Sequence, residues 1–147
     1  MADQEVPTSW TGTALLAITS AAAVASRSLR VPALVVHALL FVAGCGAFLW
    51  AYAIAIERSR REQIDVVGVY LLAGGSAPAS VRRRLLGSLA AQVAIAVTAA
   101  ALRPFTSLAA AILVPVLGLG LTGLWGARHG TFPPRSPAAE GRRQGAG

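Results

Sequence analysis

Four long apolar blocks separated by short polar segments make up most of the chain. The uncharged blocks cover residues 9–26, 33–56, 85–102 and 104–126. A helix needs about 20 mostly apolar residues to cross the roughly 30 Å hydrocarbon core of a bilayer, and each block approaches or exceeds that length. A backbone inside lipid has to satisfy its own hydrogen bonds, so each block has to be helical. The pattern therefore predicts an all-α, transmembrane four-helix bundle over residues 1–127.

The first block is the least apolar of the four, because it is rich in alanine, serine and threonine. Its alternative interpretation is a cleaved signal peptide, since Ala23, Val24 and Ala25 resemble a small-x-small cleavage site. A signal peptide has a positively charged start, whereas this chain begins with Asp3 and Glu5. We therefore favour a first span that is retained.

Small residues recur at helical spacing in the last two blocks, which predicts surfaces where helices approach closely. We interpret these residues as packing surfaces and not as a conduction path or a gate. The third block carries Gly87, Ala91, Ala94, Thr98 and Ala101, and the fourth carries Gly120, Gly123 and Ala127.

The composition supports a membrane protein and argues against nucleic acid as a partner. Hydrophobic residues form 55% of the 147-residue chain, only 13% of residues are charged, and the mean hydropathy is +0.62. Ordinary globular proteins carry about 25% charged residues. The net charge is +7, with thirteen arginines and no lysine. Because these arginines flank apolar blocks and do not line one face, anionic lipid headgroups are the expected partner.

The arginines also predict the orientation, because cytoplasmic loops of membrane proteins carry an excess of positive charge. With four spans, ten arginines lie on one side and three on the other. The chain is therefore predicted to lie in the inner (plasma) membrane of the cell, with both termini in the cytoplasm. Trp10, Trp50 and Trp125 are then predicted at the same cytoplasmic interface. The majority side holds Arg58, Arg60, Arg61, Arg82, Arg83, Arg84, Arg128, Arg135, Arg142 and Arg143.

The connector, residues 57–84, is the one long polar segment between the blocks, and six of its residues are arginine. Glu57 and Arg61 are spaced to pair across one helical turn. Residues 64–72 have the apolar spacing of a short helix lying in the membrane interface, which Gly74 and Gly75 would end. A phosphate-binding loop is excluded, because the Lys-Ser or Lys-Thr ending is missing.

Arg82, Arg83 and Arg84 are the predicted anionic lipid-binding residues. They stand at the entry to the third block, where headgroup phosphates would lie. The planar guanidinium donates two hydrogen bonds to one phosphate at once. The competing interpretation is that they only anchor the topology.

His37 and Gln92 are the intramembrane polar residues that we single out. An ionisable group within a span is a site candidate, and His37 could face a polar interior together with Gln92. The alternative is a neutral His37 near the outer headgroups, satisfied by a backbone carbonyl or water. For Gln92 the alternative is an interhelical hydrogen bond worth about 1 kcal/mol or less.

Catalysis and metal binding find no support in the residue pattern. The chain has two histidines, one cysteine and no His-x-x-x-His or Cys-x-x-Cys spacing. No acid lies within a block, which argues against a proton-coupled carrier and against the small multidrug exporters that the chain resembles in length. We therefore expect a protein that is not an enzyme and has no cofactor or metal.

Residues 128–147 are rich in proline, glycine and arginine, which predicts a disordered cytoplasmic tail. The segments 69–78 and 125–135 give the chain a resemblance to a family of uncharacterised four-span integral membrane proteins of actinobacteria, which implies no particular activity. We expect an accessory or scaffold subunit with a membrane protein partner or a second copy. The alternative is a small transporter or lipid-handling protein that binds anionic headgroups.

Overall fold

The computed structural model describes residues 4–102 and 107–135, and within these ranges the chain is all-α. The only strand-like pairing among them is an isolated antiparallel bridge between Glu62 and Pro134. Three of the helices are longer than 20 residues. In chain order the elements are α1 (Glu5–Ala25), the 3₁₀ turn η1 (Arg27–Leu29), α2 (Arg30–Ser59), α3 (Val66–Tyr70), α4 (Ala79–Leu102), the 3₁₀ segment η2 (Ser107–Leu113) and α5 (Pro115–His129).

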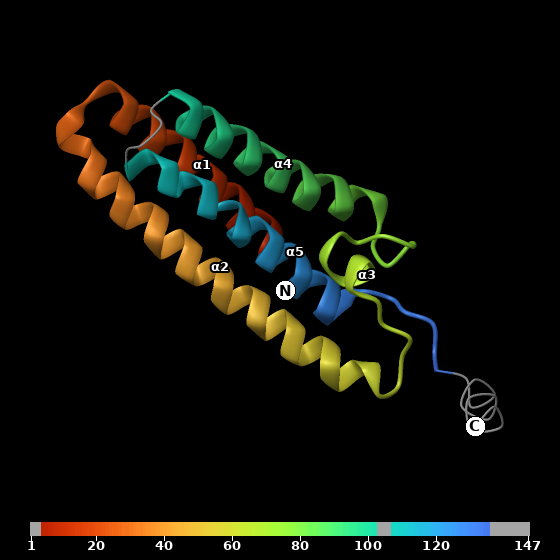
Figure 1. Cartoon of the computed structure of the whole chain (residues 1–147). Helices are drawn as coiled ribbons and strands as arrows, with labels where there is room; N and C mark the ends of the chain where they lie inside the picture. Colours follow the sequence, from red (N-terminus) through yellow and green to blue (C-terminus); the bar gives the residue numbers. More distant parts are fainter. Residues whose placement is uncertain (1–3, 103–106, 136–147) are drawn as a thin grey trace.

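The helices α1, α2, α4 and α5 lie side by side, and α5 takes the central place (Figure 1). It packs on α1, α2, α3 and α4, which is why most of its residues are buried. The turn η1 lies at one end of the molecule. The connector with α3 lies at the opposite end, beside the end of α5 (Figure 1).

Three helices are long and apolar enough to cross a membrane: 27–59, 79–102 and 109–129. They correspond to the second, third and fourth predicted spans. The helix α1, which holds the first predicted span, does not reach this apolarity among the described residues. Its many serine and threonine side chains are the reason.

The fourth predicted span, 104–126, is not one continuous α-helix. Its first part is the 3₁₀ segment η2, and the α-helix begins at Pro115. Proline has no amide hydrogen and its ring clashes with the preceding turn, so it is tolerated at the first position of an α-helix and not in its interior. Residues 104–106 lie outside the described part of the chain.

The distribution of apolar and polar side chains between surface and interior differs from that of a water-soluble protein. Large apolar side chains are exposed along α1, α2 and α4, whereas serine, threonine, glutamine and histidine side chains are buried between the helices. This arrangement suits a hydrocarbon solvent, where outward apolar groups cost nothing and polar groups need partners inside the protein. The exposed set includes Trp10, Ile18, Val31, Val35, Leu39, Val42, Leu49, Trp50, Tyr52, Val97 and Leu102.

The glycines of α5 are the places where other elements cross it. A Cβ on Gly120 would lie 2.5 Å from the Gly44 carbonyl of α2, and a Cβ on Gly118 would lie 2.8 Å from the side-chain oxygen of Gln92 in α4. Likewise, Gly123 lies against the ring of Tyr70, and Gly126 against the backbone of Val69. The positions predicted to pack in the last block therefore do lie at helix contacts.

The predicted stripe of small residues in the third block lies mostly on the outside. Ala94, Thr98 and Ala101 are exposed, and nothing lies within 4 Å of a Cβ built on Gly87. The buried face of α4 is instead Leu85, Ser88, Gln92, Ala96 and Ala99. Gln92 and Ser88 favour the burial of that face, because in lipid their polar groups need hydrogen-bond partners, whereas an alanine side chain can face the lipid.

Candidate functional site

A buried polar cluster, the Gln92 cluster, joins α1, α4 and α5 at the centre of the molecule. The Gln92 side chain is fully buried and its Nε2 donates to the Ser9 carbonyl at 3.3 Å, to Thr13 Oγ1 at 3.0 Å and, weakly, to Ser88 Oγ at 3.4 Å. Ser88 Oγ also lies 2.7 Å from Ser9 Oγ and 2.9 Å from Thr13 Oγ1. All of these groups thus find partners within the protein.

The oxygen of Gln92 has a second role at the start of α5. Gly118 is the fourth residue of α5, which begins at Pro115 at the level of the polar cluster. Gln92 Oε1 accepts the Gly118 amide at 3.1 Å. The absent side chain of Gly118 leaves room for that oxygen. Gln92 therefore links α4 to the first turn of α5.

His37 forms a separate polar contact with α1. Its side chain is 1% exposed, and Nε2 lies 3.1 Å from Thr19 Oγ1 and 3.4 Å from Ser20 Oγ. The Thr19 hydroxyl donates its proton to the Leu15 carbonyl at 2.7 Å, so it can only accept from the ring. This assigns the proton of a neutral His37 to Nε2. His37 Nδ1 is buried and has no hydrogen-bond partner among the described residues.

His37 and Gln92 do not share a polar interior, so the hypothesis that they face one together is wrong. His37 contacts α1 at Thr19 and Ser20, whereas Gln92 contacts it at Ser9 and Thr13. Thr13 and Thr19 are about 9 Å apart along a helix axis. The alternative, a neutral His37 near the outer headgroups, stays a prediction, and among the described residues hydroxyl groups of α1, not a backbone carbonyl, face its ring.

Residues 61–76 and 130–135 form a folded structure that we call the end cap, and Arg58 joins it to the end of α5. Its guanidinium donates to the Ala127 carbonyl at 2.7 Å, to the Gly130 carbonyl at 3.0 Å and to Glu62 Oε2 at 2.7 Å. It also lies 5.6 Å from the centre of the Phe132 ring. Because the last carbonyls of a helix lack partners within it, Arg58 satisfies the end of α5.

The ion pair that the connector forms is Arg58–Glu62, and no Glu57–Arg61 pair is present in the described chain. Both pairs have the same spacing, and the arginine that finds an acid is Arg58, which also bonds to the end of α5.

The first part of the predicted disordered tail is ordered. Arg128 and His129 belong to α5, and residues 130–135 run in extended form beside the connector. The Gln63 amide donates to the Pro133 carbonyl at 2.8 Å, and the Arg135 amide donates to the Arg61 carbonyl at 3.0 Å. The two prolines favour the extended form, and their partner is the chain itself. Residues 136–147 lie outside the described residues.

The predicted interfacial helix is present in shorter form as α3 and packs on α5. Asp65 begins it by accepting the Gly68 amide at 2.6 Å, and Gly74 and Gly75, with φ of 67° and 80°, form the turn after it. The Tyr70 ring stacks on Phe48 of α2 with ring centres 4.5 Å apart. Val66, Val67 and Leu71 point outward and are exposed.

The Tyr70 hydroxyl donates to the Phe48 carbonyl at 3.0 Å. Burial raises the pKa of the Tyr70 phenol above its usual value, and the nearby Tyr52 adds to the rise. The direction of this shift agrees with a phenol that stays protonated and donates.

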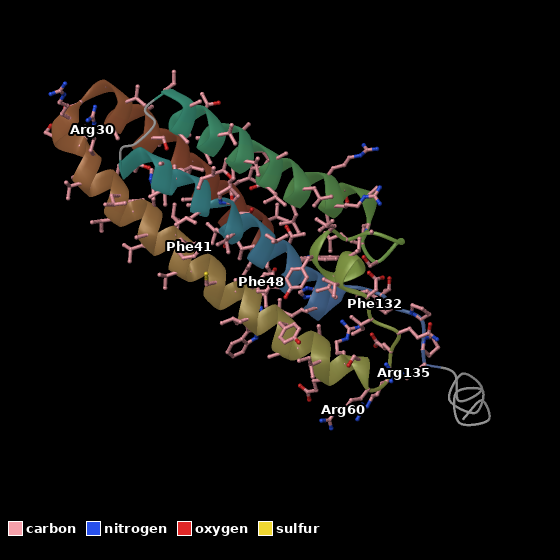
Figure 2. The ribbon with its side chains drawn as sticks, viewed as in Figure 1. Arg30, Phe41, Phe48, Arg60, Phe132 and Arg135 are labelled. Atoms are coloured by element: carbon pink, nitrogen blue, oxygen red, sulfur yellow. The ribbon has the colours of Figure 1, made fainter. Side chains whose placement is uncertain are left out.

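Figure 2 shows Arg60 and Arg135 at the end of the molecule that carries the end cap, with Phe132 near them and Arg30 at the opposite end. The three tryptophans predicted at one interface differ in exposure. Trp125 is 5% exposed and packs with Val6, Leu72 and Leu85, whereas Trp10 and Trp50 are exposed. The position of a tryptophan along a helix indicates its depth, but not which side of the helix is covered.

Arg82, Arg83 and Arg84 are exposed in the first turns of α4, and their side chains form no hydrogen bond or ion pair with any described residue. They are not equivalent. Arg84 lines a cavity of about 360 Å³ between the starts of α1 and α4, together with Val6, Pro7, Ser80 and Val81.

No three histidine, cysteine, aspartate or glutamate side chains among the described residues are placed to hold a metal ion together. Comparisons with family models, curated proteins and solved structures give no match for this chain. No similar protein therefore indicates a function, and the residues of this chain are the basis for assigning one.

Sequence reasoning missed Ser9, Thr13, Ser88 and Arg58. For the first three a signal was present, because Ser9 and Thr13, like Ser88 and Gln92, are four residues apart and share a helix face. Two such polar pairs in apolar blocks predict a contact between their helices. Arg58 carried no such signal, because its partners are backbone carbonyls about 70 residues away.

Proposed function

We propose that the chain is a four-span integral protein of the plasma membrane, with both termini and the connector in the cytoplasm. The supporting observation is the surface of exposed apolar side chains around a buried polar cluster. The outward threonines of α1 fit this placement, because the Thr8 hydroxyl donates to the Gln4 carbonyl at 2.7 Å and the Thr11 hydroxyl to the Pro7 carbonyl at 2.8 Å. Their polar groups therefore need no water.

The contacts of α1 support its retention as the first span. Ser9 and Thr13 supply partners for the buried Gln92 side chain, and Thr19 and Ser20 supply partners for His37. Cleavage after the first block would leave both side chains without these partners, each at a cost of about 1–3 kcal/mol.

Cysteine labelling tests the orientation. In a background with Cys45 replaced by alanine, Val66→Cys lies in α3 and Ser28→Cys in the turn η1, at opposite ends and both at exposed positions. A reagent that does not cross membranes is expected to label Ser28→Cys in intact cells and Val66→Cys only after the cells are opened. The reverse pattern would invert the topology, and labelling of both in intact cells would exclude a spanning arrangement.

The proposed role is a non-enzymatic accessory or scaffold subunit. The observation that carries it is that the Gln92 cluster is internally paired, with both ends of the Gln92 amide bonded to protein groups. A transporter keeps polar groups free at membrane depth for its substrate, whereas a scaffold uses them to fix helices together. The ordered end cap adds a rigid surface on which a partner could assemble.

Purification in mild detergent from native membranes tests the scaffold role. We expect a membrane partner, or a second copy, to co-purify in a fixed ratio and to be linked to this chain by a short-range crosslinker. An unrelated four-span protein with the same tag and expression level is the control. Recovery of only the monomer in several detergents, without crosslinks, would contradict the proposal.

The alternative function, a small transporter or lipid-handling protein, is favoured by one observation. His37 Nδ1 is a buried acceptor without a partner among the described residues, as a site awaiting a ligand would be. Handling of a bound substrate would then depend on His37, whereas the scaffold role would not.

A further inference from the structure

The lining of the cavity beside Arg84 is partly apolar and partly polar. Val6, Pro7 and Val81 are its apolar residues, and Arg84 and Ser80 are its polar residues. The cavity lies where α1 and α4 begin, at the end of the molecule that carries the connector (Figure 1). A site of this composition at the edge of the apolar region matches a ligand with an apolar body and a charged head.

The charge of the cavity favours an anion. The Arg84 side chain has no acidic partner among the described residues. Glu5, the acid next to Val6 in the chain, does not line the cavity, and its Oε1 pairs instead with Arg128 at 3.3 Å. Arg82 and Arg83 add positive charge nearby without lining it. An incoming phosphate would therefore meet a cation that no carboxylate among the described residues neutralises.

The local backbone adds to the same preference. The first hydrogen bond at the start of α4 is donated by the Arg82 amide to the Pro78 carbonyl at 3.0 Å. Amides that precede the first bond of a helix have no partner within the helix, and the helix dipole favours negative charge there. Ser80 and Val81 belong to this turn and also line the cavity.

We propose that this cavity binds the phosphate group of an anionic phospholipid, with Arg84 as its cation, Ser80 as a hydroxyl partner, and Val6, Pro7 and Val81 against the lipid's apolar part. The inference rests on the proposed membrane placement. It goes further by assigning the phosphate to Arg84 and not equally to the three arginines. An arginine guanidinium can hold one phosphate through two hydrogen bonds, which a diffuse positive surface cannot do.

The test measures lipid retained by the purified full chain. Protein in neutral detergent at about 0.15 M salt, where charges farther than about 8 Å are largely screened, is titrated with phosphatidylglycerol or phosphatidylcholine, and bound lipid is counted by native mass spectrometry. Both lipids carry the phosphate, but phosphatidylcholine also carries a choline cation, which Arg84 repels. We therefore expect phosphatidylglycerol to bind about tenfold more tightly than phosphatidylcholine. Equal retention of the two lipids would overturn the proposal.

Matched variants separate the site from general charge. Arg84→Gln is expected to lower phosphatidylglycerol affinity about tenfold, and Arg83→Gln, which removes the same charge outside the cavity, by no more than about twofold. Ser80→Phe fills the cavity without changing charge and is expected to abolish the preference, with an unchanged melting temperature because Ser80 is exposed. Equal losses for Arg84→Gln and Arg83→Gln would overturn the site.

Inorganic phosphate distinguishes a lipid from a free anion. We expect millimolar inorganic phosphate to leave bound phosphatidylglycerol in place, because it lacks the apolar part that the cavity walls receive. Displacement at that concentration would show a site for free phosphate and overturn the lipid assignment. Because the labelling of Ser28→Cys and Val66→Cys does not depend on lipid binding, failure of this inference is distinguishable from failure of the membrane placement.

Discussion

Gly44→Ala is expected to destabilise the protein by about 3 kcal/mol, because α2 and α5 touch through their backbones at this position. A Cβ on Gly44 would lie 2.5 Å from the Leu117 nitrogen and 2.7 Å from its Cα. These are backbone atoms, so no side-chain rotation can make room and the two helices have to separate. Separation also breaks the contact at Gly120, whose own Cβ position lies 2.5 Å from the Gly44 carbonyl.

The matched control is Gly46→Ala, two residues along the same helix. Nothing lies within 4 Å of a Cβ at Gly46, so only the higher helix propensity of alanine acts, a gain of up to about 1 kcal/mol. Unfolding both variants in a titration of mild detergent with a denaturing one gives their free energies of unfolding. Equal stability of the two variants would mean that α2 and α5 are not in contact at Gly44.

Arg58→Ala is expected to loosen the end cap by about 2–3 kcal/mol, since one side chain satisfies the Ala127 and Gly130 carbonyls and pairs with Glu62. Removal leaves these partly buried acceptors without their donor. The loss is local, because Arg58 meets α5 only near its end, at the Ala127 carbonyl, whereas the α2–α5 contacts at Gly44 and Gly120 lie farther along the helices. Arg58→Lys keeps the charge but lacks the planar fork, so it is expected to recover only part of the loss.

Hydrogen exchange of the cap amides measures this effect. The amides of Gln63, Thr131 and Arg135 bond to the Pro133, Ser76 and Arg61 carbonyls across the cap. We expect them to exchange about 30- to 150-fold faster in Arg58→Ala, in line with the change in free energy. Arg60→Ala removes an exposed arginine two residues away and serves as control. Unchanged protection in Arg58→Ala would contradict the role of Arg58.

The hypothesis that His37 and Gln92 face one polar interior shows how far a pattern of polar residues reaches. The sequence identified both as intramembrane polar residues, and both are buried. Their partners were not predictable, because a polar residue on a helix has several possible neighbours and the choice depends on which helix faces meet. For Gln92 the position of α5 decided the partner, because the Gly118 amide in the first turn of that helix lies within reach of the Gln92 oxygen.

The predictions for the tail and for the stripe of small residues in α4 were wrong for related reasons. Composition alone indicated that residues 128–135 had nothing to bury, but Arg58 and the connector supplied partners from elsewhere in the chain. Small residues at helical spacing in α4 indicated a contact, but two polar side chains on the opposite face had the greater need of burial. In both cases a contact distant in sequence outweighed a local tendency.

What the sequence determined by itself is the all-helical class and the three described helices that are apolar enough to cross a membrane, because a backbone in an apolar solvent has one main way to satisfy its hydrogen bonds, within its own segment. The choice of partners was decided only in the tertiary structure. Gln92 bonds to the Gly118 amide from 26 residues away, and Arg58 bonds to the end of α5 from 69 residues away. Such contacts depend on the rotation and spacing of whole helices, which glycines such as Gly44 and Gly120 set and which no local pattern contains.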